Sequence, residues 1–200
     1  MMGAMKPVKR SVAVIVRRPA DQADPGGHGT AGSGAFLVVR RPDDPADPLA
    51  GLWGLPAVTL RDGEDERSAV ARAGRVKLGV ELAAGARIGE KAADRGGYRL
   101  RLADYEAVIT AGVPAVPQPD TSMTQYTAFR FTADPAVLAA AAARGSLCAQ
   151  LFLEDNSKKQ RAAGPQRAAG PQRAAGPERA AGGEVPAGER AAAGEVGEPT

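Results

Sequence analysis

The sequence predicts a mixed α/β domain over residues 11–156, followed by a tail that has little to bury. In the first part, segments with strand-like alternation of apolar residues are interleaved with segments of helical periodicity, which is typical of a mixed sheet packed between helices. The chain's 200 residues allow one domain of ordinary size. All eight aromatic residues lie between Phe36 and Phe152, and we therefore expect the core there.

Three strands are predicted before the first helix, at residues 11–18, 35–41 and 57–60. The first strand places Val12, Val14 and Val16 on one side of an extended chain. A loop rich in Gly and Pro follows it, and we expect His28 in this loop to be solvated.

A helix is predicted over residues 64–78, because this segment lacks proline and its apolar residues recur three and four positions apart. Gly79 is expected to cap its C-terminus. A second helix, at residues 135–144, is expected to have Asp134 as its N-cap. The remaining predicted elements are strands at 86–92, 98–110 and 124–132 and a third helix at 147–153, where Cys148 should be buried.

The composition changes at residue 157. From there to residue 200 the chain has no aromatic residue, and the hexapeptide Arg-Ala-Ala-Gly-Pro-Gln is repeated and then decays. Such a segment buries too little to offset its chain entropy. The sequence therefore predicts an N-terminal segment at 1–10, a folded domain at 11–156 and a disordered, low-complexity tail at 157–200.

Charge and cysteine content exclude several classes of protein. The formal net charge is +3, and residues 1–156 carry 19 basic against 18 acidic side chains, so no nucleic-acid groove is expected. One Cys and one His exclude an intrachain disulfide and a cysteine zinc cluster. The apolar run at residues 12–16 is too short for a membrane span. We therefore expect a cytoplasmic protein that does not bind membranes.

The segment at residues 51–80 carries a family pattern. Gly-Leu-Trp-Gly-Leu-Pro is followed by a short predicted strand, a Gly-Glu turn and a helix ending in Leu-Gly-Val. This layout resembles the Nudix hydrolases, and Glu64, Arg72 and Gly79 match the Glu, the Arg and the last Gly of the Nudix box without a gap. The resemblance implies a Nudix-like α/β/α sandwich with a mixed β-sheet. It also implies magnesium-dependent hydrolysis of a nucleoside diphosphate linked to another group.

Five positions depart from the box, one of them Gly74, where the box has an aliphatic residue. Ala73 stands where the box has the Glu that follows its Arg, and Val76 and Lys77 stand where it has a Glu-Glu pair. Magnesium prefers six oxygen ligands, which these side chains cannot supply, and Lys77 places a positive charge where a cation should bind. Val58 replaces the first Gly of the box, so we expect the turn there to be rebuilt.

Six residues are candidates for the site, and none is assigned as catalytic. Glu64 is the box carboxylate that remains and the one candidate metal ligand, although acids at a helix N-terminus also stabilise the helix. The candidate ligand-binding residues are four cations and one aromatic residue: Arg40, Arg41, Trp53, Arg72 and Lys77. Each also has a structural interpretation, such as pairing of Arg72 with Glu64 or packing of Trp53 in the core.

Three functions fit these observations. The first is binding of a nucleoside diphosphate-type or other pyrophosphate ligand, with hydrolase activity weak or lost. The second is an active Nudix hydrolase that uses Mg²⁺ held by relocated ligands, the candidates being Glu64, Glu66, Glu81 and Glu106. The third is a scaffold whose tail recruits a partner. Only the second requires a cofactor, and a homodimer is left open in all three.

Overall fold

The structure is a computed structural model that describes residues 6–18, 34–117 and 125–162. His28 and the hexapeptide repeats, for which the sequence predicts a solvated loop and a disordered tail, lie outside the described residues.

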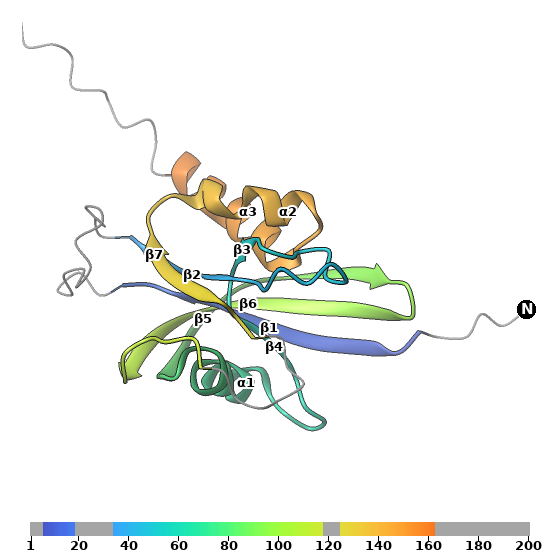
Figure 1. The fold of residues 1–200 in the computed structure, drawn as a ribbon, viewed down its shortest axis with the longest axis horizontal. Coiled ribbons are helices and arrows are strands. Elements are labelled where there is room, and N and C mark those ends of the chain that lie inside the picture. Colours follow the sequence, from blue (N-terminus) through green and yellow to red (C-terminus); the bar gives the residue numbers. More distant parts are fainter. Residues whose placement is uncertain (1–5, 19–33, 118–124, 163–200) are drawn as a thin grey trace, which may run out of the picture. The chain divides into compact units, whose positions relative to one another are not determined.

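Within these ranges, seven strands form two sheets (Figure 1). The strands are β1 (Val8–Val16), β2 (Phe36–Arg40), β3 (Trp53–Gly54), β4 (Ala57–Thr59), β5 (Glu81–Arg95), β6 (Tyr98–Ala111) and β7 (Ala128–Thr132). One sheet has the order β4-β1-β6-β5 and the other the order β3-β2-β7. Because β1 pairs parallel with β6 and antiparallel with β4, the larger sheet is mixed, as predicted.

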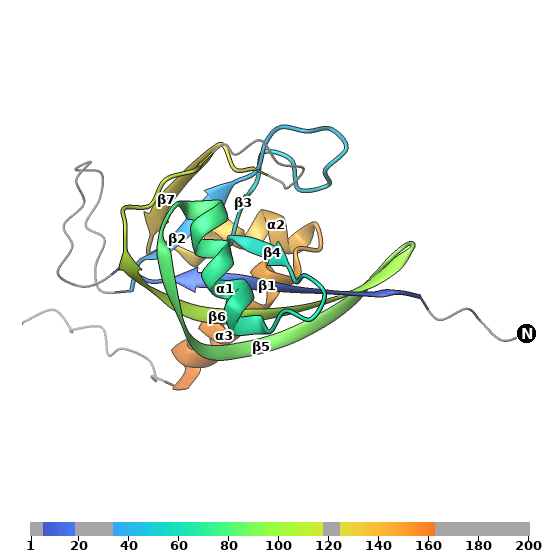
Figure 2. The same ribbon diagram turned by 90° about the horizontal axis from the view of Figure 1, so that it is seen from below.

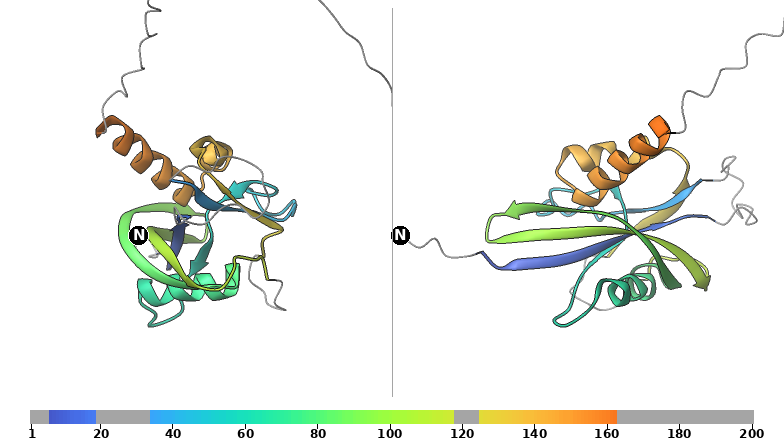
Figure 3. Two further views of the ribbon diagram at one scale, coloured as in Figure 1. Left: turned by 90° about the vertical axis from the view of Figure 1, so that its left-hand side faces the viewer. Right: turned by 180° about the vertical axis from the view of Figure 1, so that it is seen from behind.

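Helices cover the sheets from two sides. The helices are α1 (Glu66–Ala73) with a π-helical turn η1 (Gly74–Leu78), a 3-10 turn η2 (Pro135–Leu138), α2 (Ala139–Ala143) and α3 (Leu147–Ala162). Figures 1 and 2 show α1 on one side of the sheets and α2 and α3 on the other, and the views in Figure 3 agree. The predicted α/β/α sandwich with a mixed sheet is confirmed.

Strand β1 lies in the middle of the core and is buried on both faces. Its valines Val12, Val14 and Val16 pack in the cluster under α1, while Ala13 and Ile15 pack in the cluster under α2 and α3. All five side chains are at most 1% exposed. The alternation predicted from the sequence is present, but the second face is apolar too, as is common for a strand with a parallel neighbour inside a sandwich.

The ends of several elements differ from the sequence prediction. Helix α3 runs to Ala162, beyond the end predicted for it at residue 153, because the sequence has no helix-breaking pair before Gly164-Pro165. Its last turns are supported by Ser157, which donates to the Leu153 carbonyl, and by the Lys159–Asp155 ion pair. Strand β1 begins at Val8 and β5 at Glu81, both before their predicted starts, β7 begins at Ala128, after its predicted start, and β3 was not predicted.

No helix in the described ranges is both long enough and apolar enough to cross a membrane.

Candidate functional site

Helix α1 is capped at both ends, by Asp65 at its start and by Gly79 after its last turn. Asp65 is the N-cap, and its Oδ1 accepts from the backbone N–H groups of Arg67 at 2.9 Å and Ser68 at 3.1 Å. Glu64 therefore lies in the loop before the helix, although the helix was predicted to start there. After Leu78, Gly79 adopts a left-handed conformation with φ 65° and ends the helix as predicted.

The last turn of this helix is π-helical, and glycine is needed where it packs. Gly74 stands where the Nudix box has an aliphatic residue, and a Cβ atom there would lie 2.6 Å from Leu82 Cγ and 2.7 Å from the Val80 carbonyl oxygen. The helix backbone can therefore approach the start of β5 only without a side chain at this position. Single π turns inside helices are rare and occur often at functional sites.

Three of the four box positions that normally carry carboxylates are filled with other side chains. Ala73 is completely buried in the core cluster under α1, Val76 packs against the same cluster, and Lys77 is 4% exposed. They offer a methyl group, an isopropyl group and an ammonium group, none of which can ligate Mg²⁺. The residues present do not fit a Nudix magnesium site.

Val58 lies in strand β4 opposite Val12 and is 5% exposed. The chain at the position of the first box Gly is therefore extended. Where we expected a rebuilt turn, the structure has a strand.

Glu64 and Arg72 form a buried ion pair. Arg72 donates from Nε to Glu64 Oε1 at 2.8 Å and from Nη2 to Glu64 Oε2 at 2.7 Å, and Nη2 also donates to the Thr59 carbonyl at 2.8 Å. The backbone N–H of Arg61 donates to Oε2 as well. These contacts, the Arg72 hydrogen bond first, lower the pKa of Glu64 to about 2. The pair joins β4, the loop and α1, which favours the structural interpretation of both residues over a role in binding metal or ligand.

Lys77 lies among other positive charges beside an aromatic ring. Its Nζ is 5.4 Å from the centre of the Tyr126 ring. Burial lowers its pKa to about 8, and the charges of Arg41 and Arg72 contribute to this shift. The structure thus brings three of the predicted ligand-binding residues into one electrostatic neighbourhood.

A cavity of about 140 Å³ borders this neighbourhood on the side of α2 and α3. Arg41, Trp53 and Tyr126 are among its lining residues, together with the buried Cys148. Arg41 is positioned by Asp47, with 2.6 Å between Nε and Oδ2. The cavity is lined mainly by apolar side chains, with a few polar groups among them.

Arg40 does not line this cavity. Its Nε donates to the Gly51 carbonyl at 3.2 Å, and its guanidinium lies 3.9 Å from Asp43. Neighbouring residues of a strand point to opposite sides, so Arg40 and Arg41 separate as β2 ends. Trp53 has the Arg130 guanidinium 4.5 Å from its ring centre, which occupies part of one face of the indole.

The acids considered as relocated metal ligands lie in separate ion pairs. Glu66 contacts Arg10 and Arg87, Glu81 contacts Arg75, and Glu106 contacts Arg17 and Lys159. Over residues 6–18, 34–117 and 125–162, no three His, Cys, Asp or Glu side chains are grouped so that they could hold a metal ion. A large open groove of about 1150 Å³ beside the start of α1 contains Glu64 and Glu66, but not Lys77, Arg41 or Trp53.

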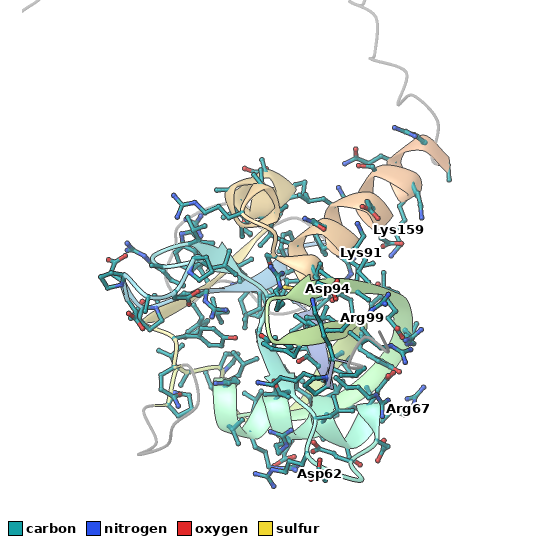
Figure 4. The ribbon with its side chains drawn as sticks, turned by 90° about the vertical axis from the view of Figure 1, so that its right-hand side faces the viewer. Asp62, Arg67, Lys91, Asp94, Arg99 and Lys159 are labelled. Atoms are coloured by element: carbon teal, nitrogen blue, oxygen red, sulfur yellow. The ribbon has the colours of Figure 1, made fainter. Side chains whose placement is uncertain are left out.

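Charged side chains are spread over several faces. In Figure 4, Asp62 and Arg67 lie on the α1 side of the sheets, while Lys91 and Lys159 lie toward α3. Lys91 pairs there with Glu154.

Two notable residues were missed by the sequence reasoning. Tyr126 is 3% exposed, and its hydroxyl oxygen accepts from the Ala57 N–H at 3.1 Å, so it links β4 to the chain before β7. Asp104 is completely buried, and among the residues that the structure describes neither of its carboxylate oxygens has a hydrogen-bond partner. Asp104 had a signal in the sequence, because it follows Leu100 and Leu102 on the inward face of an alternating strand.

No protein-family model matches the sequence, and no curated protein matches it. Solved structures do match. The solution structure of the E. coli ORF135 protein has a TM-score of 0.54 at 21% identity, covering 83% of this chain and 99% of that one. A Nudix hydrolase from Nitrosomonas europaea has a TM-score of 0.53 at 16% identity, covering 77% of this chain and 90% of that one. The MutT protein from Methanosarcina mazei has a TM-score of 0.51 at 16% identity, covering 78% and 97%.

The chain therefore has the fold of the Nudix hydrolases, and the resemblance seen in residues 51–80 is confirmed at the level of the fold.

Proposed function

We propose that this protein binds a nucleoside diphosphate-type or other pyrophosphate ligand, and that its hydrolase activity is weak or lost. The observation that carries the proposal is the chemistry of the box helix: Ala73, Val76 and Lys77 replace carboxylates, and the remaining box acid, Glu64, is held by Arg72. Without carboxylates at these three positions, the helix lacks the oxygen ligands with which the Nudix box would hold Mg²⁺ and lower the pKa of an attacking water.

The proposed ligand binding rests on the positively charged and aromatic side chains near the box helix. Arg41 and Tyr126 line the cavity, and Tyr126 also contacts Lys77, so an apolar or aromatic part of a ligand in the cavity would bring its phosphates toward two cations. Trp53 supplies a flat apolar wall to the same cavity. Arg40 and Arg72 contribute less in this proposal, since Arg40 points elsewhere and the Arg72 guanidinium is engaged by Glu64 and Thr59.

Two assays on the purified chain test the proposal. ADP, ADP-ribose and the nucleoside triphosphates are incubated with the protein and Mg²⁺, and release of phosphate or nucleoside monophosphate is measured. The same compounds are then titrated in a thermal unfolding assay in EDTA, where a ligand at a hundredfold excess over its Kd should add about 2.7 kcal/mol of stability.

We expect stabilisation by at least one compound and little or no turnover. Turnover that requires Mg²⁺, together with micromolar Mg²⁺ binding in a calorimetric titration, would instead establish the active hydrolase with relocated ligands. Absence of both binding and turnover would contradict the proposal entirely.

A further inference from the structure

Two arginines that come from different sheets line the cavity of about 140 Å³. Arg41 directly follows β2, and Arg95 is the last residue of β5. We propose that Arg95 recognises the base of the bound nucleotide, so that the cavity selects a pyrimidine with an oxygen at ring position 4, as in UDP, over one with an amino group there, as in CDP. This inference rests on the proposed function, because it specifies the ligand of the same cavity.

Arg95 reaches the cavity from the hairpin that joins β5 to β6. Its Nη2 donates to the Gly145 carbonyl at 2.5 Å, and a Cβ atom on Gly145 would lie 3.5 Å from its Nη1. The guanidinium therefore packs against the corner between α2 and α3. Among the described residues, no hydrogen bond is formed by Nε or Nη1 of Arg95. These two donors remain for a group that enters the cavity.

The charged side chains that line the cavity are hydrogen-bond donors only. Arg41 is held by Asp47, but within the described part of the chain no carboxylate is among the lining residues. The side-chain oxygen and sulfur atoms of the lining come from Tyr126, Ser146 and Cys148. Of these, Ser146 Oγ and Cys148 Sγ lie 3.2 Å apart and bond to each other. Because a guanidinium has five N–H groups and no acceptor, a ligand must bring the acceptor itself.

The cavity has room for a single aromatic ring. An apolar cavity of about 150 Å³ holds one benzene molecule, so a volume of about 140 Å³ suits a pyrimidine better than a two-ring purine. Leu49 and Trp53, which line the cavity, are only partly buried. The cavity is therefore reached from the surface, and the sugar and diphosphate of a bound nucleotide can extend out of it.

A donor on the cavity wall distinguishes an oxygen from an amino group. Uracil, like thymine, presents the acceptor O4, whereas cytosine presents an amino group at the same ring position. Arg95 can donate to O4, but beside cytosine its N–H groups would face other N–H groups, and both sets of donors would lose their partners away from water. A loss of this kind weakens binding by about tenfold or more.

The test titrates the full chain with UDP, CDP and ADP by isothermal titration calorimetry, in EDTA and again with Mg²⁺. Arg95→Met removes the donors and keeps an apolar side chain, and Arg95→Gln supplies an amide that can donate or accept. The matched control is Arg99→Met, because Arg99 lies on the same hairpin, is exposed and does not line the cavity (Figure 4). Melting curves establish that each variant folds.

We expect wild type and Arg99→Met to bind UDP about tenfold or more tightly than CDP, and more tightly than ADP. In Arg95→Met the affinity for UDP should fall to that for CDP. In Arg95→Gln the two affinities should differ by less than about threefold, because the amide can turn either its oxygen or its nitrogen to the ring.

Equal affinities of wild type for UDP and CDP, or tighter binding of CDP or ADP, would overturn this inference and leave the proposed function intact. A preference for UDP that is fully retained in folded Arg95→Met or Arg95→Gln would also overturn it, because another group would then recognise the ring. Failure of wild type to bind any of the three probes, with or without Mg²⁺, would overturn both the inference and the proposed function.

Discussion

Arg72 donates hydrogen bonds to both carboxylate oxygens of Glu64, with Nε–Oε1 and Nη2–Oε2 distances of 2.8 and 2.7 Å. The Arg72 side chain is 8% exposed and the Glu64 side chain 12%. The contact fixes the loop before α1 to the helix itself, and Arg72 also reaches the Thr59 carbonyl in β4. This pair survives although the carboxylates around it in the box have been replaced. The pair thus ties β4, the loop before α1 and the helix together at this point.

Replacing Glu64 with Gln should leave the Arg72 charge buried without a matching carboxylate. We expect the free energy of unfolding to fall by about 3 kcal/mol, because removing one partner of a buried ion pair leaves the charge of the other partner buried without compensation. Urea unfolding at pH 7 measures this loss. The control is Glu81→Gln, because Glu81 pairs with Arg75 where both side chains are about half exposed, and it should change stability by less than about 1 kcal/mol. Equal effects of the two substitutions would contradict the structural role of the buried pair.

The same carboxylate should make the protein sensitive to acid. The pKa of Glu64 is lowered to about 2 in the folded state, against 4.5 for an unperturbed glutamate. The unfolded chain therefore binds the proton more readily, and the stability supplied by Glu64 is complete above pH 4.5 and is lost as the pH falls toward 2. Melting temperatures across this range should fall less steeply for Glu64→Gln than for wild type. If the melting temperature falls with pH equally steeply in wild type and Glu64→Gln, other groups cause the acid sensitivity.

Asp104 should make stability fall in the opposite direction, toward high pH. Burial raises its pKa to about 8, against 3.8 for an unperturbed aspartate, so the folded state holds the proton more tightly between these values. The contribution of Asp104 to the free energy of unfolding is therefore largest below pH 3.8, and it decreases as the pH rises toward 8. Asp104→Val removes the buried charge at nearly the same volume, and we expect a gain of about 2 kcal/mol in unfolding free energy at pH 8.5.

Asp104→Asn is the matched control for the titration. Its amide is as polar as the protonated acid but cannot ionise, so the pH dependence should disappear while stability at pH 5 stays close to that of wild type. Unfolding curves at pH 5, 7 and 8.5 for wild type and both variants measure this. A wild-type slope retained in both variants would show that Asp104 is not the titrating group.

The sequence predicts this fold wherever the signal is local. The period-two pattern of Val12, Val14 and Val16 identifies β1, and the caps Gly79 and Asp134 mark helix ends that the structure has. The Glu64–Arg72 pair was foreseeable because the family spacing brings the two residues together across one loop. The end of α3 was predicted at residue 153, which is too early, because the sequence has no helix breaker before Gly164-Pro165.

The contacts that form the candidate site join residues that lie far apart in the sequence, and local sequence patterns do not predict them. Tyr126 reaches Lys77 because β7 pairs antiparallel with β2, with Arg40 opposite Ala128, which places the chain before β7 beside Arg41. The π turn depends on how closely Gly74 approaches Leu82, a packing detail set by β5. The isolation of Asp104 likewise depends on which groups happen to surround it.

Gly74 should not tolerate a methyl group. An added Cβ would come within 2.6 Å of Leu82 Cγ and 2.7 Å of the Val80 carbonyl oxygen, and the latter is backbone that cannot move freely. Although alanine is favoured over glycine in helices by about 1 kcal/mol, we expect Gly74→Ala to lower the free energy of unfolding by about 1 to 3 kcal/mol. Gly74→Ala in a Leu82→Ala background should cost less, because part of the clash is removed. A stabilising Gly74→Ala would contradict the close packing of α1 against β5.

Lys77 should cost the protein stability in the absence of ligand. Its pKa is lowered to about 8 from 10.5, so the unfolded chain holds the proton more tightly between these values, and stability rises with pH across this window. Below pH 8 both states are protonated, and the folded state carries the whole cost of burying the charge. We expect Lys77→Met to gain about 1 to 2 kcal/mol of unfolding free energy at pH 7, and the gain to shrink near pH 10.5. Denaturant unfolding at both pH values measures this, and a loss at pH 7 would show that the ammonium group is held favourably without ligand. A gain would mean that the charge is kept at the expense of the empty protein's stability, as is common for groups that stabilise a bound ligand.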